Sequence, residues 1–257
     1  MSIKKAVEKI KEFRTELEDQ YEELRAEIEA RFGKRRDDDE VFRPLPEPRG
    51  MQMTLMRALQ TRRSERNFSN EPLTDQMVSN LLFAADGINR KNGRRTTPSA
   101  LDWRETDIYL LKSNGIWRWV PERRGLLFCA KHDVREASYV ISTQLTLPPL
   151  EIVYVTNKER TRNLLTEAVE TLAPKIARTG VKEDDLEEMR LRAYHLDVGV
   201  KVQSVYLAAA AMRLACVART GFPAARLAEA LHLKDDEMVV AAQSVGYPAR
   251  SILDHIK

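Results

Sequence analysis

The apolar positions of the first 36 residues follow a seven-residue repeat. Residues 3–32 contain neither Pro nor Gly, and successive apolar residues lie three or four positions apart, with one gap at Arg14. These residues are Ile3, Val7, Ile10, Leu17, Tyr21, Leu24 and Ile28. The spacing predicts a helical segment over residues 1–36. Such a segment suits a coiled coil or docking helix for a partner protein, a helix on the protein's own surface, or an artificially added segment.

Residues 37–50 have the composition of a linker. Four acidic residues come first, and Pro44, Pro46 and Pro48 then fall within five positions. Because proline fixes φ and lacks a backbone N–H, this stretch should be extended rather than helical. The sequence therefore predicts a linker over residues 37–50 and a main domain over residues 51–257.

The main domain mixes helical and strand patterns without a regular βαβ repeat. The predicted helices are 51–61, 75–86 (capped by Thr74 and Gly87), 159–178, 183–214 and 224–231. The predicted strands are 107–112, 116–120, 126–130, 150–156 and 238–245, with a hairpin at Asn114-Gly115. The apolar run Val205–Met212 indicates a buried central helix. This mixture predicts an α+β fold, with helices around a mainly antiparallel sheet.

The composition is that of an ordinary folded protein with many charges. Of the 257 residues, 43% are hydrophobic and 32% are charged, which excludes a disordered chain. The longest apolar run, Val205–Met212, is far shorter than the roughly 20 residues of a membrane-spanning helix. Cys129 and Cys216 are distant in sequence, and the histidines lack metal-ligand spacing. We therefore expect a cytoplasmic protein with reduced cysteines, no membrane segment and no metal site.

The charges are unevenly distributed. Residues 1–40 carry 10 Lys and Arg against 13 Asp and Glu, whereas the remainder carries 32 against 26. A modestly basic main domain favours a phosphate-bearing small molecule. The excess is too small, and too little interleaved with aromatic residues, to indicate nucleic-acid binding.

Three polar clusters interrupt the apolar pattern, at residues 61–68, 93–103 and 217–222. In the first cluster, Arg62, Ser64 and Arg66 would share one side of an extended chain. Arginine binds oxyanions bidentately and keeps its charge, so this cluster suits a phosphate group. The alternative is an Arg-rich surface turn, and the other two clusters are equally compatible with ordinary surface connections.

Taken together and in this order, the motifs resemble the FMN-dependent nitroreductase superfamily. The nearest branch is the one that includes the SagB-type dehydrogenases of peptide maturation. The matching segments run from about Met51 to Arg250 in the order and spacing of that family. They are RRSxRxF from Arg62, LLFAADGINR from Leu81, GRRTTPSA from Gly93, GVKVQSVYLAA from Gly199 and VGYP from Val245.

The resemblance implies an α+β homodimer with FMN at the subunit interface. By similarity, Arg62, Arg63, Ser64 and Arg66 would hold the phosphate, ribityl chain and pyrimidine edge of the flavin. Pro98, Ser99 and Asp102 would reach the flavin from the partner subunit. Ala218, Arg219, Thr220 and Gly221 would lie against the isoalloxazine, with a backbone N–H near Thr220 facing N5. Arg250 would be a second phosphate ligand.

The chain departs from the family pattern at several positions. Asp102 stands where Asn is usual, Arg104 where Gln is common, Ser204 where Asn is common and Arg213 where Gly is usual. An ionised carboxylate cannot donate a hydrogen bond as an amide does. Asp102 would therefore be protonated, turned toward an arginine, or a sign of altered flavin binding.

The peptide-maturation branch uses a Lys-Tyr pair ahead of the central helix. The counterpart here is Ala193-Tyr194, so the lysine is absent. Tyr194 is a candidate proton donor, and a packing role for this amphipathic side chain is the alternative. The missing lysine argues against azoline oxidation.

The resemblance implies an oxidoreductase that takes a hydride from NADH or NADPH at flavin N5. The electrons would pass to a small conjugated acceptor, such as a nitroaromatic or quinone-like compound. One alternative is a non-catalytic flavin-fold subunit that presents its N-terminal helix to a partner. Another is a flavin dehydrogenase of a peptide or natural product, in which residues 3–32 recruit a partner enzyme.

Overall fold

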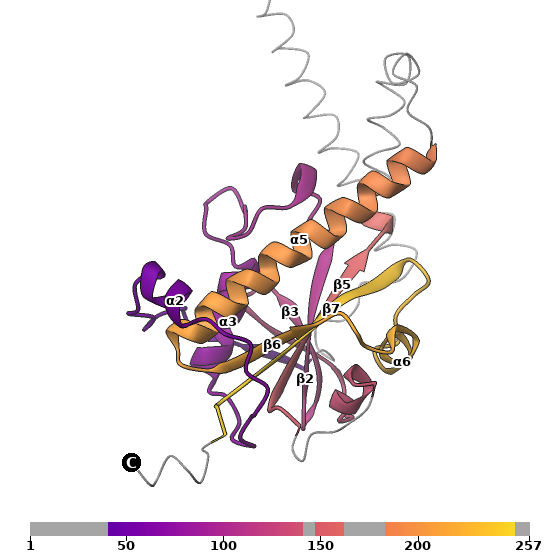
Figure 1. Ribbon diagram of the computed structural model, residues 1–257. Coiled ribbons are helices and arrows are strands. Elements are labelled where there is room, and N and C mark those ends of the chain that lie inside the picture. Colours follow the sequence, from indigo (N-terminus) through magenta and orange to yellow (C-terminus); the bar gives the residue numbers. More distant parts are fainter. Residues whose placement is uncertain (1–40, 141–146, 162–182, 250–257) are drawn as a thin grey trace, which may run out of the picture. The chain divides into compact units, whose positions relative to one another are not determined.

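The computed structural model describes residues 41–140, 147–161 and 183–249 (Figure 1). The helical segment predicted over residues 1–36 lies outside these residues, as does Arg250. Of the helix predicted over 159–178, only residues 159–161 fall inside. In the described residues, no helix is both long and apolar enough to cross a membrane.

A seven-stranded sheet forms the centre of the domain, in the order β1-β4-β3-β2-β5-β7-β6. Every pairing is antiparallel, which confirms the predicted α+β class. The strands are β1 (Phe42–Pro44), β2 (Thr106–Lys112), β3 (Gly115–Val120), β4 (Gly125–Ala130), β5 (Leu150–Asn157), β6 (Ala215–Arg219) and β7 (Glu237–Gly246).

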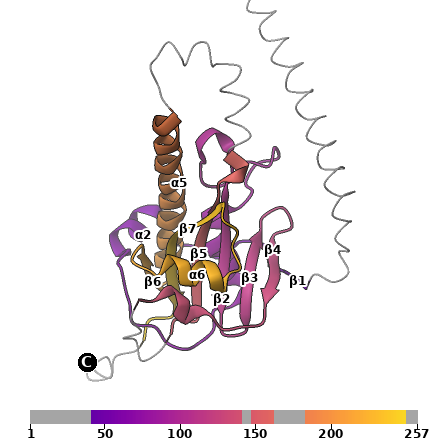
Figure 2. The ribbon, with the colours of Figure 1, turned by 90° about the vertical axis from the view of Figure 1, so that its right-hand side faces the viewer.

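Helices cover both faces of this sheet. The α-helices are α2 (Leu55–Thr61), α3 (Asp75–Asp86), α5 (Glu183–Ala211) and α6 (Ala224–Ala230), and the short 3-10 turns are η2 (Ala100–Asp102) and η3 (Arg135–Ser138). In the turned view of Figure 2 the long helix α5 stands beside the strands.

Local signals explain where several elements begin and end. Thr74 caps α3 by accepting a hydrogen bond from the N–H of Met77. Thr54 caps α2 in the same way, so that helix begins at Leu55 and not at Met51 as predicted. The hairpin needs glycine at Gly115, whose φ is +135° and whose added Cβ would lie 2.4 Å from a backbone oxygen.

The side chains of β5 alternate between two cores. Ile152 and Tyr154 belong to the larger core, which α3 and α5 cover. Val153 and Val155 belong to the smaller core, beneath α6. All of these side chains are buried, because a strand directs successive residues to opposite faces and both faces of β5 are covered.

The central helix α5 is buried along one side only. Val205, Ala208 and Ala209 are buried, whereas Leu207 and Ala210 remain half-exposed. The predicted burial of the apolar run Val205–Met212 therefore holds for one side of the helix and not for the other. The helix also ends at Ala211, before the predicted residue 214, because the chain turns into strand β6.

Two predicted boundaries need correction. The alternative interpretation of residues 217–222 as a surface connection does not hold for the first part of that segment, because β6 occupies it and pairs with β7. From Phe42 onward, the predicted linker is part of the folded domain. Strand β1 pairs with β4. The backbone N–H and carbonyl of Arg49 form hydrogen bonds of 3.0 and 2.8 Å with the Asn80 side chain. An edge strand tolerates Pro44. The compact unit therefore starts at Phe42 rather than at Met51.

Candidate functional site

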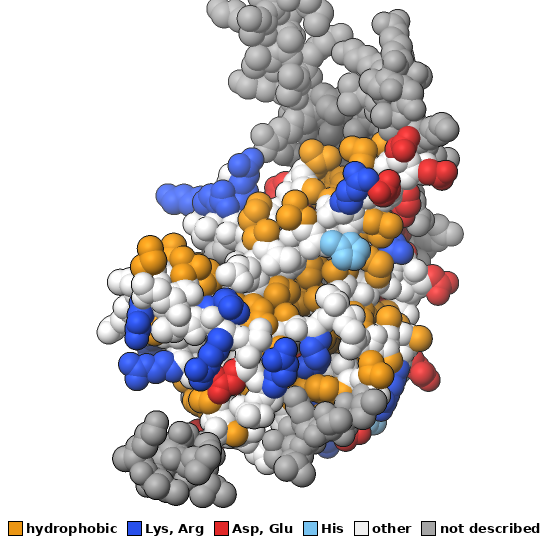
Figure 3. Space-filling view, in the orientation of Figure 1, with side chains coloured by type: hydrophobic (Ala, Val, Ile, Leu, Met, Phe, Trp, Pro, Cys, Tyr) orange, Lys and Arg blue, Asp and Glu red, His pale blue; other side chains and the backbone are white. Residues whose placement is uncertain are grey.

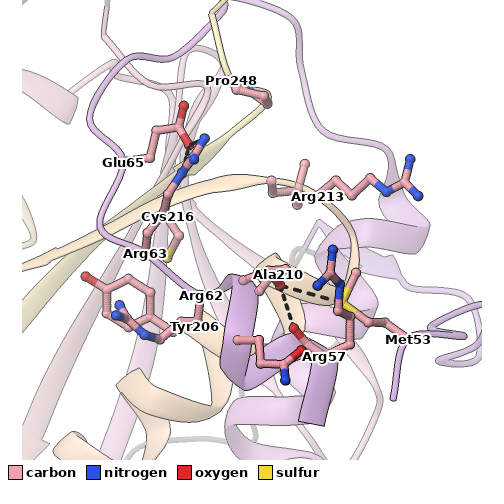
Figure 4. Close-up of a pocket in the computed structure, with 13 residues that line it drawn as sticks. Met53, Arg57, Arg62, Arg63, Glu65, Tyr206, Ala210, Arg213, Cys216 and Pro248 are labelled. Carbon is pink, nitrogen blue, oxygen red and sulfur yellow. Dashed lines mark hydrogen bonds and ion pairs between the residues drawn. The ribbon is translucent and has the colours of Figure 1, made fainter. Parts of the chain in front are cut away.

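An open cavity of about 790 Å³ lies between α2, the C-terminal end of α5 and the start of β6 (Figure 4). Its walls come from α2, from the residues on either side of that helix, from the α5–β6 connection and from Pro248. The lining residues are Met53, Arg57, Gln60, Thr61, Arg62, Arg63, Glu65, Tyr206, Ala210, Arg213, Leu214, Cys216 and Pro248.

The cavity is strongly basic. Four arginines line it, and Glu65 is the acidic residue among the lining side chains. Arg63 binds that carboxylate at 2.9 Å, and the Arg62 guanidinium lies 5.3 Å from the centre of the Tyr206 ring. Figure 3 shows basic side chains gathered around α2 and the adjacent end of α5. Arginine-rich walls of this kind suit an oxyanion such as phosphate.

The segment that carries these arginines is anchored to β6 through Tyr206. The Glu65 N–H donates to the Cys216 carbonyl at 2.9 Å. The Tyr206 hydroxyl accepts from the Ala218 N–H at 2.8 Å and lies 3.0 Å from the Ser64 hydroxyl. Sequence reasoning did not single out Tyr206. The signal that could have identified it is its hydroxyl group, the polar side-chain group within the apolar run Val205–Met212.

The end of β6 is exposed, as a ligand-contacting segment requires. Thr220 and Gly221 are both exposed, and an added Cβ at Gly221 would meet no atom within 4 Å. The Arg219 side chain is directed into a buried cluster. Its guanidinium donates to Glu151 at 2.9 Å and stacks on the Tyr139 ring at 4.0 Å. Only the backbone of Arg219 can therefore face a ligand beside β6.

Pro98, Ser99 and Asp102 lie near the middle of α5. Asp197 of α5 accepts a hydrogen bond of 2.7 Å from the Ala100 N–H. Asp197 and Tyr206 are nine residues apart on one helix, which separates them by about 13 Å along its axis. A single chain therefore does not bring this set together with Arg62, Ser64 and Arg66.

Buried charges hold the segment that contains Pro98–Asp102. The Lys201 ammonium contacts Asp86 at 2.7 Å and the Thr97 hydroxyl at 3.2 Å. Arg95 contacts the same Asp86 carboxylate at 3.2 Å. Lys201 and Asp86 are less than a tenth exposed, so this pair joins α3, the 93–97 segment and α5 without solvent between them.

Two more buried carboxylates lie next to this pair. Glu105 lies 3.3 Å from the Ser99 hydroxyl and accepts from Thr106 at 3.0 Å. Burial raises the pKa of Glu105, and the nearby Asp197 carboxylate raises it further. Burial also raises the pKa of Asp197, although the hydrogen bond from the Ala100 N–H and the positive charge of Lys201 both act to lower it. The middle of α5 therefore lies against three carboxylates around one ammonium group.

Asp102 is turned toward an arginine. Arg104 binds it through two hydrogen bonds of 3.1 and 2.7 Å, and this contact lowers the pKa of Asp102. Both residues have positive φ values, 58° for Asp102 and 53° for Arg104. Of the three predicted states of Asp102, the structure supports the ionised, arginine-paired one.

The structure gives Tyr194 a packing role and does not support it as a proton donor. Its side chain is buried, its hydroxyl is hydrogen-bonded to Thr161, and its ring lies 6.4 Å from that of Trp103. It does not line the arginine-rich cavity. Cys216 does line it, but burial raises the pKa of its thiol to about 12, so the sulfur is not a thiolate nucleophile.

Comparisons with known proteins agree with this architecture. The model of the nitroreductase family matches residues 59–247. A candidate nitroreductase of Methanocaldococcus jannaschii is 26% identical over 183 residues, which cover 68% of this chain and 82% of that protein. A crystal structure of a candidate nitroreductase from Ralstonia eutropha has a TM-score of 0.66 at 28% identity, and the match covers 82% of this chain and 90% of that one.

A microcin synthetase complex from E. coli also matches, with a TM-score of 0.58 at 16% identity over 74% of this chain and 70% of that one. At that identity the likeness concerns the fold alone. The family match spans well over half of the residues, so the chain belongs to the nitroreductase family. Its class is accordingly that of the flavin-dependent oxidoreductases.

Proposed function

We propose that the protein is an FMN-dependent oxidoreductase that takes a hydride from NADH or NADPH and passes it to a small conjugated acceptor. Nitroaromatic and quinone-like compounds are the acceptor class. The observation that carries the proposal is the arginine-lined cavity at the start of β6, in a chain of the nitroreductase family.

The residues around β6 fit a flavin phosphate and ring. Cys216 and Thr220 are four residues apart, which spans about 13 Å along a strand. A phosphate in the cavity and a ring beside Ala218–Gly221 can therefore follow one strand. Arg62 and Arg63 would hold the phosphate. Arg250, which lies outside the described residues, would be a further phosphate ligand.

When bound, the flavin supplies two-electron hydride transfer, and the protein supplies binding, orientation and electrostatics. Arg66 would place positive charge near the pyrimidine edge and favour the negative charge of the reduced ring. The Thr220 N–H would orient the ring at N5. Tyr206 would hold the arginine segment against β6. No described side chain needs to act as a nucleophile.

We further propose that the protein works as a homodimer. Leu207, Ala210 and Ala211 leave a half-exposed apolar strip along α5, which a second copy would cover. Pro98, Ser99 and Asp102 of one chain would then reach the flavin of the other. The molar mass of the full-length protein in solution, measured by light scattering, tests this arrangement. A monomer that still binds flavin would contradict it.

The visible absorption spectrum of the purified protein tests the main proposal. We expect flavin bands that bleach when NADPH or NADH is added without oxygen, and that return when a quinone is added. Absence of flavin bands after incubation with excess FMN would refute the proposal. Arg62→Gln should weaken flavin binding, whereas the matched control Arg226→Gln, an exposed arginine on α6, should not.

A non-catalytic scaffold is the second candidate, and one observation favours it. The carboxylate of Asp102 stands where the family usually has an amide, and it is paired with Arg104. Without an amide to donate a hydrogen bond at this position, flavin binding would be weaker. The variant Asp102→Asn separates the two functions. A protein that binds flavin only after this substitution would support the scaffold, and one that binds flavin without it would exclude the scaffold.

A further inference from the structure

Strand β6 forms one edge of the described sheet and pairs with β7 on its inner side. On its outer side, the Ala218 N–H donates to the Tyr206 hydroxyl at 2.8 Å. Successive peptide groups of a strand point in opposite directions, so the Arg219 N–H faces β7 and the Thr220 N–H faces outward, on the same side as that of Ala218. The last pair of the strand joins Arg219 to Ala242. The orientation of the outward Thr220 N–H therefore depends on how firmly Arg219 is held.

The side chain of Arg219 ties this last pair to three other elements. Its guanidinium donates to the Glu151 carboxylate at 2.9 Å and to the Ser138 and Tyr139 hydroxyls at 3.0 and 3.1 Å, and it also donates to the Ser244 hydroxyl. Glu151 belongs to β5, Ser244 to β7 and Ser138 to η3. The end of β6 is thus fixed by a side chain as well as by its backbone pairing.

Glu151 is the centre of this network. Its carboxylate is fully buried and accepts hydrogen bonds from Arg219, from the Ser244 hydroxyl at 2.7 Å and from the Tyr139 hydroxyl. The two hydroxyls therefore accept from the guanidinium and donate to the carboxylate at the same time. Linked hydrogen bonds between opposite charges in a buried site hold the groups in one geometry. Removal of either charge would leave the other buried and unpaired, so the two side chains act as a unit.

We propose that Arg219 and Glu151 are positioning residues, which hold the Thr220 N–H in place at flavin N5. This inference rests on the proposed flavin site, where that N–H orients the ring. Neither side chain would touch the flavin, because the guanidinium is engaged in the buried network and the carboxylate has no exposed surface. Neither of them lines the arginine-rich cavity. Their effect should therefore fall on hydride transfer, which depends on accurate placement, and hardly on phosphate binding.

Arg219→Met tests the role of the guanidinium, since it keeps an unbranched side chain and removes the hydrogen bonds. In FMN-loaded protein, stopped-flow absorbance gives the rate constant for anaerobic flavin reduction by whichever nicotinamide reduces wild type. This rate constant should fall about 10- to 100-fold. The dissociation constant for FMN should rise by no more than about threefold, because Arg62 and Arg63 remain. Arg219→Lys keeps the charge and should recover part of the rate.

Leu126→Ala is the matched control for lost stability. Leu126 is buried in β4, which four strands separate from β6. Truncation of a buried leucine destabilises a protein, but at this distance it should leave the reduction rate within about twofold of wild type. A purely structural role of Arg219 predicts a different result: Arg219→Met would lose stability in urea unfolding, as Leu126→Ala does, and would still be reduced at the wild-type rate.

Glu151→Gln tests whether Glu151 acts through Arg219. It should also slow flavin reduction, and the double variant with Arg219→Met should be no slower than Arg219→Met alone, because the two side chains act as a unit. Tyr139→Phe removes one bridging hydroxyl but keeps the ring that stacks on the guanidinium, and it should slow reduction about threefold. This milder variant decides the question if the charge variants do not fold.

Reduction within about twofold of the wild-type rate in Arg219→Met overturns the proposal, as does the same result in Tyr139→Phe where Arg219→Met does not fold. Additive effects of Arg219→Met and Glu151→Gln overturn the link between the two residues, and equal slowing in Leu126→Ala overturns the positioning role. Failure of the proposed function is a different result. Wild type itself would then show no flavin bands, or bands that no nicotinamide bleaches, and this inference would fall with it.

Discussion

The middle and the C-terminal end of helix α5 differ in how their charged groups are paired. At the middle, Asp197 and Lys201 belong to an enclosed cluster whose charged groups are paired or hydrogen-bonded. Toward the C-terminal end, Tyr206 and Ala210 line an open cavity in which arginines outnumber acidic residues. Figure 1 shows α2 beside this C-terminal end.

This difference separates a structural role from a binding role. A buried charge must be paired, because its lost hydration is costly. The enclosed cluster at the middle of α5 therefore pairs its own charges, and it fixes the segment that contains Pro98–Asp102. The open end keeps Arg57 and Arg213 hydrated and without a carboxylate partner in the described part of the chain. Such charges cost little to maintain and remain available for a ligand.

The strongest way to break this comparison is to remove the ammonium group of the enclosed cluster at the middle of α5. Lys201→Met should leave Asp197 and Glu105 without their nearby cation, and Asp86 paired with Arg95 alone. Breaking a buried pair in this way typically costs about 3–5 kcal/mol. Urea unfolding monitored by circular dichroism would measure the loss in the free energy of unfolding.

The matched control for Lys201→Met is Arg192→Gln, which removes one charge from an exposed pair with Glu188 on the same helix. Exposed pairs contribute about 0–1 kcal/mol, so this variant should remain close to wild type. Equal destabilisation of the two variants would contradict the distinction between the enclosed and exposed charges of α5.

The next largest effect is expected at the open end, on binding rather than on stability. Arg62→Gln should weaken flavin affinity by about 10- to 100-fold, since a charged hydrogen bond contributes about 1.5–3 kcal/mol. The unfolding free energy without flavin should hardly change. Flavin fluorescence titration gives the affinity. A large loss of stability without flavin would show that Arg62 supports the fold instead of the ligand.

Local signals made part of this structure predictable. Thr74 and Gly87 mark both ends of α3, and Asn114-Gly115 marks the hairpin, so the structure agrees with the sequence at these elements. Strand β6 was missed because its identity depends on pairing with β7, which follows it by some twenty residues. Strand β1 was missed because Pro44 and the two prolines that follow it indicated a linker, although an edge strand accepts a proline.

Sequence reasoning could predict only the part of the candidate site that is formed by residues close together in the sequence. The arginines from Arg62 to Arg66 were found from their spacing and resemblance. The pairing of Asp102 with Arg104 depends on two left-handed residues that no local pattern predicts. The burial of the Arg219 side chain depends on Glu151, which lies 68 residues away in sequence. Such contacts arise from tertiary structure.

A smaller effect is expected on the stability of the open end. Arg213→Gly should raise the free energy of unfolding by about 1 kcal/mol, because Arg213 has a φ of 58° and glycine adopts a positive φ without the crowding of a Cβ. For a chain of this size that corresponds to an increase in Tm of about 2–4 °C. Scanning calorimetry without ligand would measure it. Arg213→Ala keeps the Cβ and removes the charge, so it should not raise Tm. Were both variants stabilised equally, charge repulsion and not backbone strain would be the cause.

The smallest effect is expected at Glu105, and it depends on pH. Burial raises the pKa of Glu105 in the folded protein, so the folded state holds its proton more tightly than the unfolded state does. The stability that this carboxyl contributes is complete below its unfolded pKa of about 4.3 and is lost as pH rises through the folded value. Glu105→Gln keeps the shape and one oxygen acceptor but does not titrate.

Wild type and Glu105→Gln should therefore differ least in free energy of unfolding near pH 4. As pH rises, the stability of Glu105→Gln relative to wild type should increase until the difference levels off. Urea midpoints measured from pH 4 to pH 8 would show this. Asp197 titrates with the same sign and Asp102 with the opposite sign, but both are present in each protein, so their contributions largely cancel in the difference. Parallel stability curves would mean that burial does not raise the pKa of Glu105, and that the acidic cluster at the middle of α5 is hydrated like the open end.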